Sequence, residues 1–457
     1  MKFKEEINES YTMAEAIKEA QRCLQCKVPQ CKKGCPISND IPDWIHELKK
    51  GNMGNAISII RAKSNLPAVC GRVCGHEKQC EGACVLGKKG QPVNIGKLER
   101  FVADFDSENE LTHEDVVEKT RGKVAVIGAG PSGITVAGDL ARIGFAVEMF
   151  EMEAQCGGVL RYGIPEYRLP KEVVAREIRH IEKMGVIIHR NTHVGVEITV
   201  DTLFAQGFDA IFIGTGLGKP KSLEIPIYQN GRCISEGEGG TKCADLKRIR
   251  LAAHFLRRVE LISEGFMKRD EIPVDDGAKV YVIGCGNTAM DASRTALRIG
   301  ASAVDIVYHR GIDTMSALRA EYDDAVKEGV HFNWWSAITE IHVDDNLDIK
   351  EIVLETNEPD KEPVRRVLPA DNIIMAIGAT PNTKIVRSTS GLENDDRKFL
   401  ITRDVPYGMT TRKGVFAGGD VANRQATVVH AMQDAKLVAQ GITQYVDAVK
   451  LMKLINM

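Results

Sequence analysis

From residue 123 onward, the pattern of hydrophobic and polar positions alternates between two periods. Short apolar runs, typical of buried parallel strands, are each followed by a glycine turn and by apolar positions at helical spacing. One such unit runs from a predicted strand over 123–127 to a strand over 146–150, and a similar unit runs from 279–283 to 304–308. Both predicted helices end in Arg-Ile-Gly. The chain is therefore expected to be an α/β protein with two Rossmann-like parallel-sheet domains.

The residues before about 117 lack this alternation and predict helices instead. Thr12 and Glu15, three residues apart, form a capping-box signal for a helix over 13–21, and 41–50 and 55–62 predict two more short helices. Residues 104–120 are acidic and polar and predict a solvated linker. Much later in the chain, 228–241 is rich in Gly, Glu and Ser and predicts an exposed loop.

The turn after the first predicted strand carries a glycine-rich motif that consists of Gly128, Gly130, Pro131, Ser132 and Gly133. In a dinucleotide fold, the first glycine permits the turn, the second lets the backbone approach a pyrophosphate, and the third allows helix and strand to pack closely. Glu151 ends the next strand, where a carboxylate accepts hydrogen bonds from ribose hydroxyls. Strand, glycines, helix and acid in this register predict a nucleotide site rather than a bare glycine turn.

The second repeat carries a related motif that consists of Gly284, Gly286, Asn287 and Thr288, with an alanine in the third glycine position. His309 and Arg310 stand at the end of its second strand, where the first repeat has Glu151. A carboxylate there would repel a 2′-phosphate, whereas a guanidinium attracts it. The second repeat is therefore predicted to bind NADPH rather than NADH. The alternative is that Arg310 lies on a solvated surface without a ligand.

A third glycine motif, late in the chain, indicates a flavin. An apolar strand ends in Gly419 and Asp420, and a helix is predicted from about residue 426, so that Thr427 lies at its start. The aspartate can meet a ribityl hydroxyl, and the helix N-terminus can face the electron-rich edge of the flavin. FAD is accordingly assigned to the first repeat. Two further strand-to-glycine turns, expected where the chain passes between the domains, contain Thr215, Gly216 and Gly378.

Composition and charge exclude some classes of function. Sixty Lys and Arg against 63 Asp and Glu give a net charge of −3, which argues against a nucleic-acid partner. No apolar run reaches membrane-spanning length, and the first residues lack the apolar core of a signal peptide. A cytoplasmic location is expected, where twelve cysteines predict metal or redox chemistry rather than disulfides.

Eight of the twelve cysteines lie in two dense N-terminal runs: Cys23, Cys26, Cys31, Cys35, Cys70, Cys74, Cys80 and Cys84. Dense runs with a Cys-Pro end favour [4Fe–4S] clusters, whereas zinc favours two Cys-x2-Cys pairs separated by a loop. Outside these runs, Cys156 and Cys285 each stand alone. Neither forms the closely spaced pair that a disulfide reductase needs, so electrons on a flavin must leave by another route.

Taken together, these motifs resemble the small (beta) subunit family of NADPH-dependent glutamate synthase, which includes the large subunit of NADH-dependent ferredoxin–NADP oxidoreductase. The resemblance covers nearly the whole chain. The matching segments are 70–74, 80–84, 95–100, 157–165 with Gly158 and Leu160, 284–291, 376–382 and 418–420. It implies an NADPH domain inserted into an FAD domain and preceded by a helical iron–sulfur domain. The implied boundaries are 1–117 (two clusters), 118–275 (FAD), 276–380 (NADPH) and 381–457 (FAD).

The resemblance also implies how the clusters are held. Cys23, Cys26, Cys31 and Cys84 would hold one cluster, and Cys35, Cys74 and Cys80 would hold the other. Glu99 is the implied fourth ligand of the second cluster, with Cys70 either spare or in its place; the alternative for Glu99 is a surface ion pair. His309 departs from the family, which usually has an Arg-Arg pair here.

No catalytic side chain is implied, because the cofactors carry the chemistry. The expected activity is an NADPH oxidoreductase subunit that passes electrons through FAD and [4Fe–4S] clusters to a larger partner, such as the glutamate synthase large subunit. One alternative is the NADPH-binding subunit of an electron-bifurcating transhydrogenase, whose partner is a second flavoprotein. Another is a non-catalytic electron-wiring subunit. An oligomeric assembly is compatible with all three.

Overall fold

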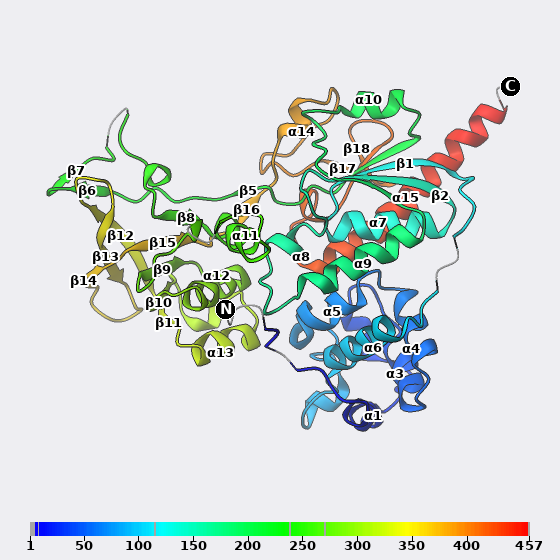
Figure 1. Cartoon of the computed structure of the whole chain (residues 1–457), viewed down its shortest axis with the longest axis horizontal. Coiled ribbons are helices and arrows are strands. Elements are labelled where there is room, and N and C mark those ends of the chain that lie inside the picture. Colours follow the sequence, from blue (N-terminus) through cyan, green and yellow to red (C-terminus); the bar gives the residue numbers. More distant parts are fainter. Residues whose placement is uncertain (1–4, 8, 114–115, 237–238, 269–270, 456–457) are drawn as a thin grey trace. The chain divides into compact units, whose positions relative to one another are not determined.

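The computed structural model describes residues 5–7, 9–113, 116–236, 239–268 and 271–455 (Figure 1). The chain forms two compact units. The larger unit contains 6–161, 168–218 and 380–457, and the smaller unit contains 162–167 and 219–379, together with Glu5 near the N-terminus. The smaller unit is thus an insertion in the larger one, as expected. The boundaries 1–117, 118–275, 276–380 and 381–457 remain predictions, since this division does not separate the helical module from the first sheet.

The larger unit begins with a helical module, drawn in blue in Figure 1. Its helices are α1 (Met13–Gln21), α2 (Gln30–Gly34), α3 (Ile41–Lys49), α4 (Met53–Arg61), α5 (Pro67–Val73) and α6 (Ile95–Asn109), with short 3₁₀ turns at His76–Lys78 and Val85–Lys88. The capping box is confirmed, because Thr12 N–H donates to Glu15 Oε2 at 2.8 Å and Glu15 N–H donates to Thr12 Oγ1 at 3.3 Å. Trp44, Leu48 and Leu66 are fully buried in this module.

The predicted linker over 104–120 is wrong at its start, since α6 continues to Asn109. Its acidic residues are not all solvated: Asp106 is 3 % exposed and accepts hydrogen bonds from Arg61 Nε and Nη2 at 3.3 and 3.1 Å. The Arg61 Nη1 also donates to Glu177 at 3.2 Å. The acidic composition of this segment predicts a loop. The prediction is wrong at its start because a buried arginine, distant in the sequence, pairs with Asp106.

A seven-stranded sheet forms the rest of the larger unit, in the order β17-β18-β19-β4-β1-β2-β3. The strands are β1 (Gly122–Ile127), β2 (Phe145–Phe150), β3 (Ile187–His189), β4 (Ala210–Ile213), β17 (Thr402–Asp404), β18 (Tyr407–Thr410) and β19 (Val415–Ala417). The pairs from β19 to β3 are parallel, and β17 and β18 add an antiparallel edge. The strands predicted over 123–127 and 146–150 are confirmed as β1 and β2. The carboxyl ends of β1, β4 and β19 therefore lie side by side.

The helices of this sheet are α7 (Pro131–Arg142), α8 (Val159–Tyr162), α9 (Lys171–Lys183), α10 (Val200–Ala205), α14 (Lys384–Arg387) and α15 (Val428–Ile455). Helix α15 begins close to the predicted residue 426 and packs along α7. No helix among the described residues is long and apolar enough to cross a membrane.

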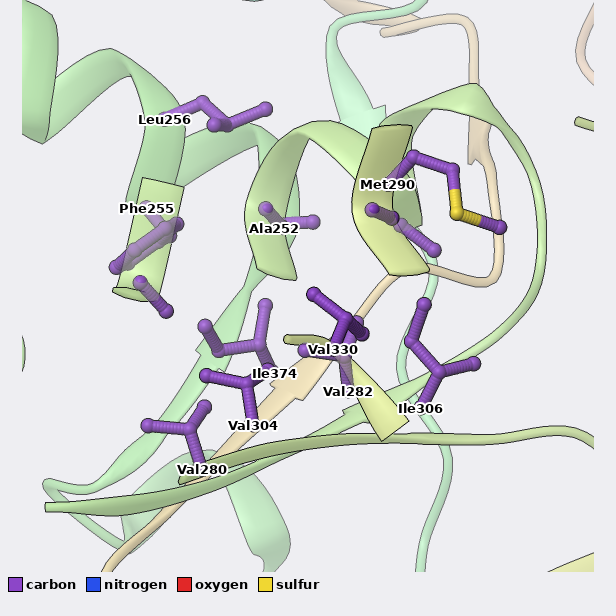
Figure 2. Close-up of a cluster of buried hydrophobic side chains, with 14 of the residues drawn as sticks. Ala252, Phe255, Leu256, Val280, Val282, Met290, Val304, Ile306, Val330 and Ile374 are labelled. Carbon is purple, nitrogen blue, oxygen red and sulfur yellow. The ribbon is translucent and has the colours of Figure 1, made fainter. Parts of the chain in front are cut away.

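The smaller unit has a parallel five-stranded sheet in the order β11-β10-β9-β15-β8. Its strands are β8 (Ile249–Leu251), β9 (Lys279–Ile283), β10 (Ala303–Val307), β11 (His331–Asn333) and β15 (Asn372–Met375), and its helices are α11 (Ala252–Ser263), α12 (Asn287–Arg298) and α13 (Arg319–Lys327). Figure 2 shows the core, in which Phe255 and Met290 from the helices pack over Val282, Ile306 and Ile374 of the strands. The second predicted repeat is thus confirmed.

A second sheet of the smaller unit has the order β14-β13-β12-β6-β7. It consists of β6 (Ile227–Gln229), β7 (Arg232–Cys233), β12 (Ser336–Val343), β13 (Ile349–Thr356) and β14 (Val364–Pro369), and a separate ladder joins β5 (Lys219–Pro220) to β16 (Ala379–Thr380). The exposed loop predicted over 228–241 is therefore wrong at its start. Residues Asn230 and Gly231 have φ of 49° and 78°, and this Asn-Gly turn joins β6 to β7 as a hairpin.

Candidate functional site

The turn between β1 and α7 leaves open space where a dinucleotide phosphate is expected. A Cβ on Gly128 would lie 2.7 Å from the Gly214 carbonyl oxygen, and one on Gly133 would lie 1.9 Å from the Gly128 carbonyl oxygen. At Gly130 a Cβ would meet nothing closer than Gly158 Cα, at 4.0 Å. Gly128 and Gly133 are therefore required by the fold, whereas Gly130 keeps a surface open. This cradle fits a pyrophosphate.

Glu151 lies beside the same turn, at the end of β2. Its side chain is 6 % exposed, and its Oε2 accepts a hydrogen bond from Ala129 N–H at 2.8 Å, while Oε1 accepts one from Glu153 N–H at 2.9 Å. Burial raises the pKa of Glu151, and these backbone donors oppose that effect. The carboxylate is thus held rigidly, and its remaining lone pairs fit the hydroxyls of a ribose.

The third glycine motif lies against the first. A Cβ on Gly419, which has φ +71°, would come within 2.9 Å of Ser132 Oγ, so this contact requires glycine. Asp434 of α15 fixes the loop, because its Oδ2 accepts from Gly419 N–H at 2.6 Å and its Oδ1 accepts from Tyr407 O–H at 2.7 Å. Sequence reasoning missed Asp434 and Tyr407, since nothing local marks either residue as a partner of Gly419.

Asp420 follows directly and borders a cavity of about 230 Å³ that is also lined by Tyr407, Asn423, His430 and Asp434. Burial, and then the charge of Asp434, raise the pKa of Asp420 to about 6. No hydrogen bond links its carboxylate to another side chain or backbone group of the described chain. An unpartnered, largely buried carboxylate beside Gly419 fits a ribityl hydroxyl as its partner.

The other predicted FAD residues differ in how closely they approach this site. Gly158 approaches Gly130, because a Cβ on Gly158 would lie 3.0 Å from Gly130 Cα, and Leu160 is fully buried in α8. Thr215 and Gly216 follow β4, and Thr427 forms a 2.7 Å hydrogen bond with His430 Nδ1 at the start of α15. Pro131 and Ser132 begin α7. All of them belong to the larger unit.

The glycine motif of the smaller unit is built in the same way. A Cβ on Gly284, which has φ +121°, would lie 2.4 Å from the Ala376 carbonyl oxygen, whereas at Gly286 the nearest atom is Ser316 Oγ at 3.3 Å. Asn287 Oδ1 accepts from Leu318 N–H at 2.8 Å, which holds the 316–318 loop beside the motif. Thr288 continues α12, and Gly378 follows β15 with open space around it.

His309 and Arg310 are exposed just beyond β10. Trp335 positions this loop. Its backbone N–H donates to the Arg310 carbonyl oxygen at 3.1 Å, and its indole ring would lie 2.7 Å from a Cβ on Gly311. The Arg310 guanidinium has no ion pair with any described residue. An exposed, unpaired cation at this edge of the sheet fits a 2′-phosphate.

The first set of cysteines converges on one cavity. Cys23, Cys26, Cys31 and Cys84 line it together with apolar residues that include Ile41, Ile45 and Ile95. Burial, followed by the neighbouring thiols, raises the pKa of Cys31 to about 11. Four sulfurs around an apolar cavity fit a [4Fe–4S] cluster.

The second set of predicted ligands also lies together. A hydrogen bond with Cys70 and burial raise the pKa of Cys74, with further effects from Glu99 and Cys80. Burial raises the pKa of Cys35 to about 12, and Glu99 and Cys70 again contribute. The five groups are therefore electrostatic neighbours in the larger unit, and their sulfur and carboxylate donors fit a cluster.

Glu99 and Cys70 differ in their surroundings. Glu99 is 8 % exposed, burial raises its pKa to about 8, and its carboxylate forms no hydrogen bond or ion pair with the described residues. Cys70 is 2 % exposed, and its Sγ lies 3.7 Å from Met432 Sδ and 3.8 Å from Ser64 Oγ. The surface ion pair considered for Glu99 is absent from the described structure, and this orphaned carboxylate fits a cluster ligand.

The N-terminal helical module and the rest of the chain each match a known protein family. Residues 1–111 match the family described as dihydropyrimidine dehydrogenase domain II, 4Fe-4S cluster, and residues 122–435 match the pyridine nucleotide-disulphide oxidoreductase family. All twelve cysteines are free in the structure, with Cys156 and Cys285 buried singly. The match over 122–435 includes both glycine motifs. The described cysteines form no disulfide bond.

Two curated relatives align along nearly the whole chain. The glutamate synthase (NADPH) small chain of Escherichia coli (strain K12) is 32 % identical and covers 97 % of this chain and 94 % of its own. The NAD-dependent dihydropyrimidine dehydrogenase subunit PreT of the same strain is 32 % identical and covers 97 % and 98 %. Among solved structures, Lactococcus lactis thioredoxin reductase covers 72 % of this chain and 99 % of its own with a TM-score of 0.51 and 23 % identity, which supports the fold alone.

Proposed function

We propose that this chain, which belongs to the pyridine nucleotide-disulphide oxidoreductase family and within it to the glutamate synthase small chain homologues, oxidises NADPH and passes single electrons to a partner subunit. The family makes it an NAD(P)H oxidoreductase that binds FAD, NAD(P) and a 4Fe-4S cluster. The proposal adds the preference for NADPH, a second cluster and the partner. Relatives described as a small chain and as a subunit support the existence of a partner.

The residues of each site divide the work. Arg310 attracts the 2′-phosphate of NADPH, and the Gly284 and Gly286 turn receives its pyrophosphate. The Gly128–Gly133 turn, Glu151 and Asp420 bind and orient FAD. Once bound, FAD would supply the chemistry that side chains lack, namely acceptance of a hydride as two electrons and their release one at a time.

The observation that carries the proposal is the convergence of Cys23, Cys26, Cys31 and Cys84 on one apolar cavity, in the same unit as the Gly128 turn and Asp420. Cys23, Cys26 and Cys31 share one short segment, whereas Cys84 comes from a segment far away in the sequence, so the fold brings the fourth thiol to the other three. A chain that only bound nucleotides would not need this assembly. With no cysteine pair beside the glycine motifs, clusters are the exit for electrons.

An anaerobic titration of the reconstituted protein with NADPH, and separately with NADH, tests the proposal. We expect NADPH to bleach the flavin absorbance at lower concentrations than NADH, because Arg310 favours the extra phosphate. A flavin that neither nucleotide bleaches would support the electron-wiring alternative and contradict the proposal. Copurification then distinguishes a glutamate synthase large subunit from a second flavoprotein, which the transhydrogenase alternative requires.

A further inference from the structure

The cavity of the first four cysteines adjoins an exposed apolar surface. Leu24 lines the cavity together with Cys23 and Cys26, yet its side chain is 61 % exposed. Val28, in the same loop, is 60 % exposed. Two large apolar side chains in water next to a redox site are typical of a transient interface, because electron transfer requires the two centres to approach closely.

Four exposed lysines lie in the two segments that line this cavity, and we call them the lysine patch: Lys27, Lys33, Lys88 and Lys89. Lys27 and Lys33 lie in the segment of Cys26 and Cys31, and the other two end the turn that begins directly after Cys84. The Arg22 guanidinium ties the two segments together, since it donates to the carbonyl oxygens of Gln91 at 2.6 Å and Pro92 at 3.1 Å.

The lysine patch carries a positive charge, although the net charge of the whole chain is negative. Residues 22–39 and 82–98 contain no Asp or Glu, whereas the whole chain carries a net charge of −3. Two acids on neighbouring segments are paired elsewhere: Asp40 with Lys32, and Glu47 with Lys50 at 2.8 Å. Asp43, exposed on α3, and Glu77, exposed in the turn His76–Lys78, are opposing charges nearby in the sequence.

The four lysines of the patch have no ion pair with any residue that the structure describes. Their charges therefore face solvent and are available to a partner. Like-signed, unpaired charges around an apolar centre attract an oppositely charged protein and orient it before contact.

From this arrangement we infer that the lysine patch, with Leu24 and Val28 at its centre, docks the acidic face of a protein that exchanges single electrons with the first cluster. The inference rests on the proposed function, since it places that cluster at the exit. It adds the surface, the charge of the partner and the cluster through which electrons leave. One electron crosses per encounter: the cluster of this chain is oxidised by one electron and the partner is reduced by one.

Two haem carriers of opposite charge test this inference, namely the acidic soluble domain of cytochrome b5 and the basic cytochrome c. The holoenzyme reduces each carrier anaerobically with NADPH, and the second-order rate constant is followed by absorbance from low to high salt. The test variant carries Lys27→Gln, Lys33→Gln, Lys88→Gln and Lys89→Gln. A matched control carries Lys247→Gln, Lys327→Gln, Lys361→Gln and Lys413→Gln, four exposed lysines outside the patch.

We expect the patch variant to reduce cytochrome b5 about tenfold more slowly at low salt, within the range of electrostatic steering, while flavin bleaching is unchanged. The difference should vanish near 1 M salt, where the Debye length is about 3 Å. Cytochrome c should not be slowed. An equal loss in the control variant, or a rate for cytochrome b5 that does not depend on the patch, would overturn the inference.

Binding is measured separately, by zero-length carbodiimide coupling of the holoenzyme to cytochrome b5 and mass spectrometry of the linked peptides. Links at Lys27, Lys33, Lys88 or Lys89 are expected, and links confined to other lysines would contradict docking at the patch. If NADPH fails to bleach the flavin, dithionite supplies the electrons to the clusters instead. Failure of the NADPH step would then reject the proposed function, while the patch is still tested.

Discussion

The Asp434 carboxylate accepts a hydrogen bond from the Gly419 N–H at 2.6 Å, and so joins the final helix to the third glycine motif. The same carboxylate accepts from Tyr407 O–H at 2.7 Å and is 7 % exposed. Asp420 is thereby held beside the cavity without being bonded itself. In the loop that we propose to receive the flavin, a neighbouring residue, and not Asp420, thus accepts the hydrogen bond of Gly419.

Asp434→Ala should destabilise the protein and release FAD. It removes the acceptor of the buried Gly419 N–H, and an unsatisfied buried donor costs about 1–3 kcal/mol. Tyr407→Phe, which removes one hydrogen bond to the same carboxylate, should cost about 1 kcal/mol. Urea unfolding of the FAD-free protein measures both changes. A smaller loss for Asp434→Ala than for Tyr407→Phe would contradict this role.

Gly130→Ala and Gly133→Ala should separate binding from folding. A Cβ at Gly133 would lie 1.9 Å from a carbonyl oxygen, so this variant should be strongly destabilised, whereas Gly130 has open space. Gly130→Ala should therefore leave the FAD-free protein stable but weaken FAD binding about tenfold or more, because the methyl fills the pyrophosphate site. Gly54→Ala, in open space on α4, is the control. Normal FAD affinity in Gly130→Ala would place the pyrophosphate elsewhere.

Arg310→Gln should remove the preference for NADPH. Loss of a charged contact to the 2′-phosphate costs about 2 kcal/mol, so the KM for NADPH should rise about tenfold or more while that for NADH stays constant. Arg365→Gln, an exposed arginine that pairs with Glu340 in the second sheet, is the matched control. Equal changes for both nucleotides would show that Arg310 does not contact the phosphate.

Asp420→Asn should stabilise the FAD-free protein above pH 6. The pKa of this carboxyl is raised on folding from 3.8 to about 6, so the folded protein binds the proton more tightly. The ionised group therefore destabilises the fold increasingly as pH rises through this window, by about 3 kcal/mol at pH 7.5. Urea unfolding at pH 4 and pH 7.5 measures the effect. The gain should be present at pH 7.5 and absent at pH 4, and FAD binding should weaken; a gain equal at both pH values would refute the ionisation argument.

Alanine variants should decide between Glu99 and Cys70 at the second cluster. Glu99 has no partner among the described residues, whereas the Cys70 sulfur contacts Met432 and Ser64. We expect Glu99→Ala to lose about one iron atom per chain and to convert the cluster signal to that of a three-iron cluster, while Cys70→Ala keeps full iron. Glu99→Gln, which retains an oxygen donor, is the structural control. Iron loss in Cys70→Ala instead would make the thiol the ligand.

Local signals in the sequence predicted most of the fold. The Thr12 capping box, the strands of both repeats and the glycine turns were read from neighbouring residues, because their causes are backbone sterics and short-range hydrogen bonds. The hairpin at Asn230-Gly231 has a local signal as well, because Asn-Gly favours a tight turn between two strands. The Gly, Glu and Ser around it predict a loop by composition alone, and here turn chemistry outweighs composition.

The features that could not be predicted depend on distant residues. Asp106 of α6 is buried because it forms an ion pair with Arg61, which comes from another helix, α4. Asp434 reaches Gly419 through the packing of the final helix, and Trp335, which directly precedes β12, holds the Arg310 loop. The roles of the predicted cofactor ligands remain proposals, with their positions in the fold now described.

The most direct test of the account is the iron content and electron paramagnetic resonance of the reconstituted protein after anaerobic addition of NADPH. The account predicts about eight iron atoms per chain, as two [4Fe–4S] clusters require, and signals of reduced clusters that appear as the flavin is reduced. A protein with zinc in place of iron, or with a bleached flavin and clusters that stay oxidised, would contradict the claim that the cysteines carry electrons from NADPH to a partner.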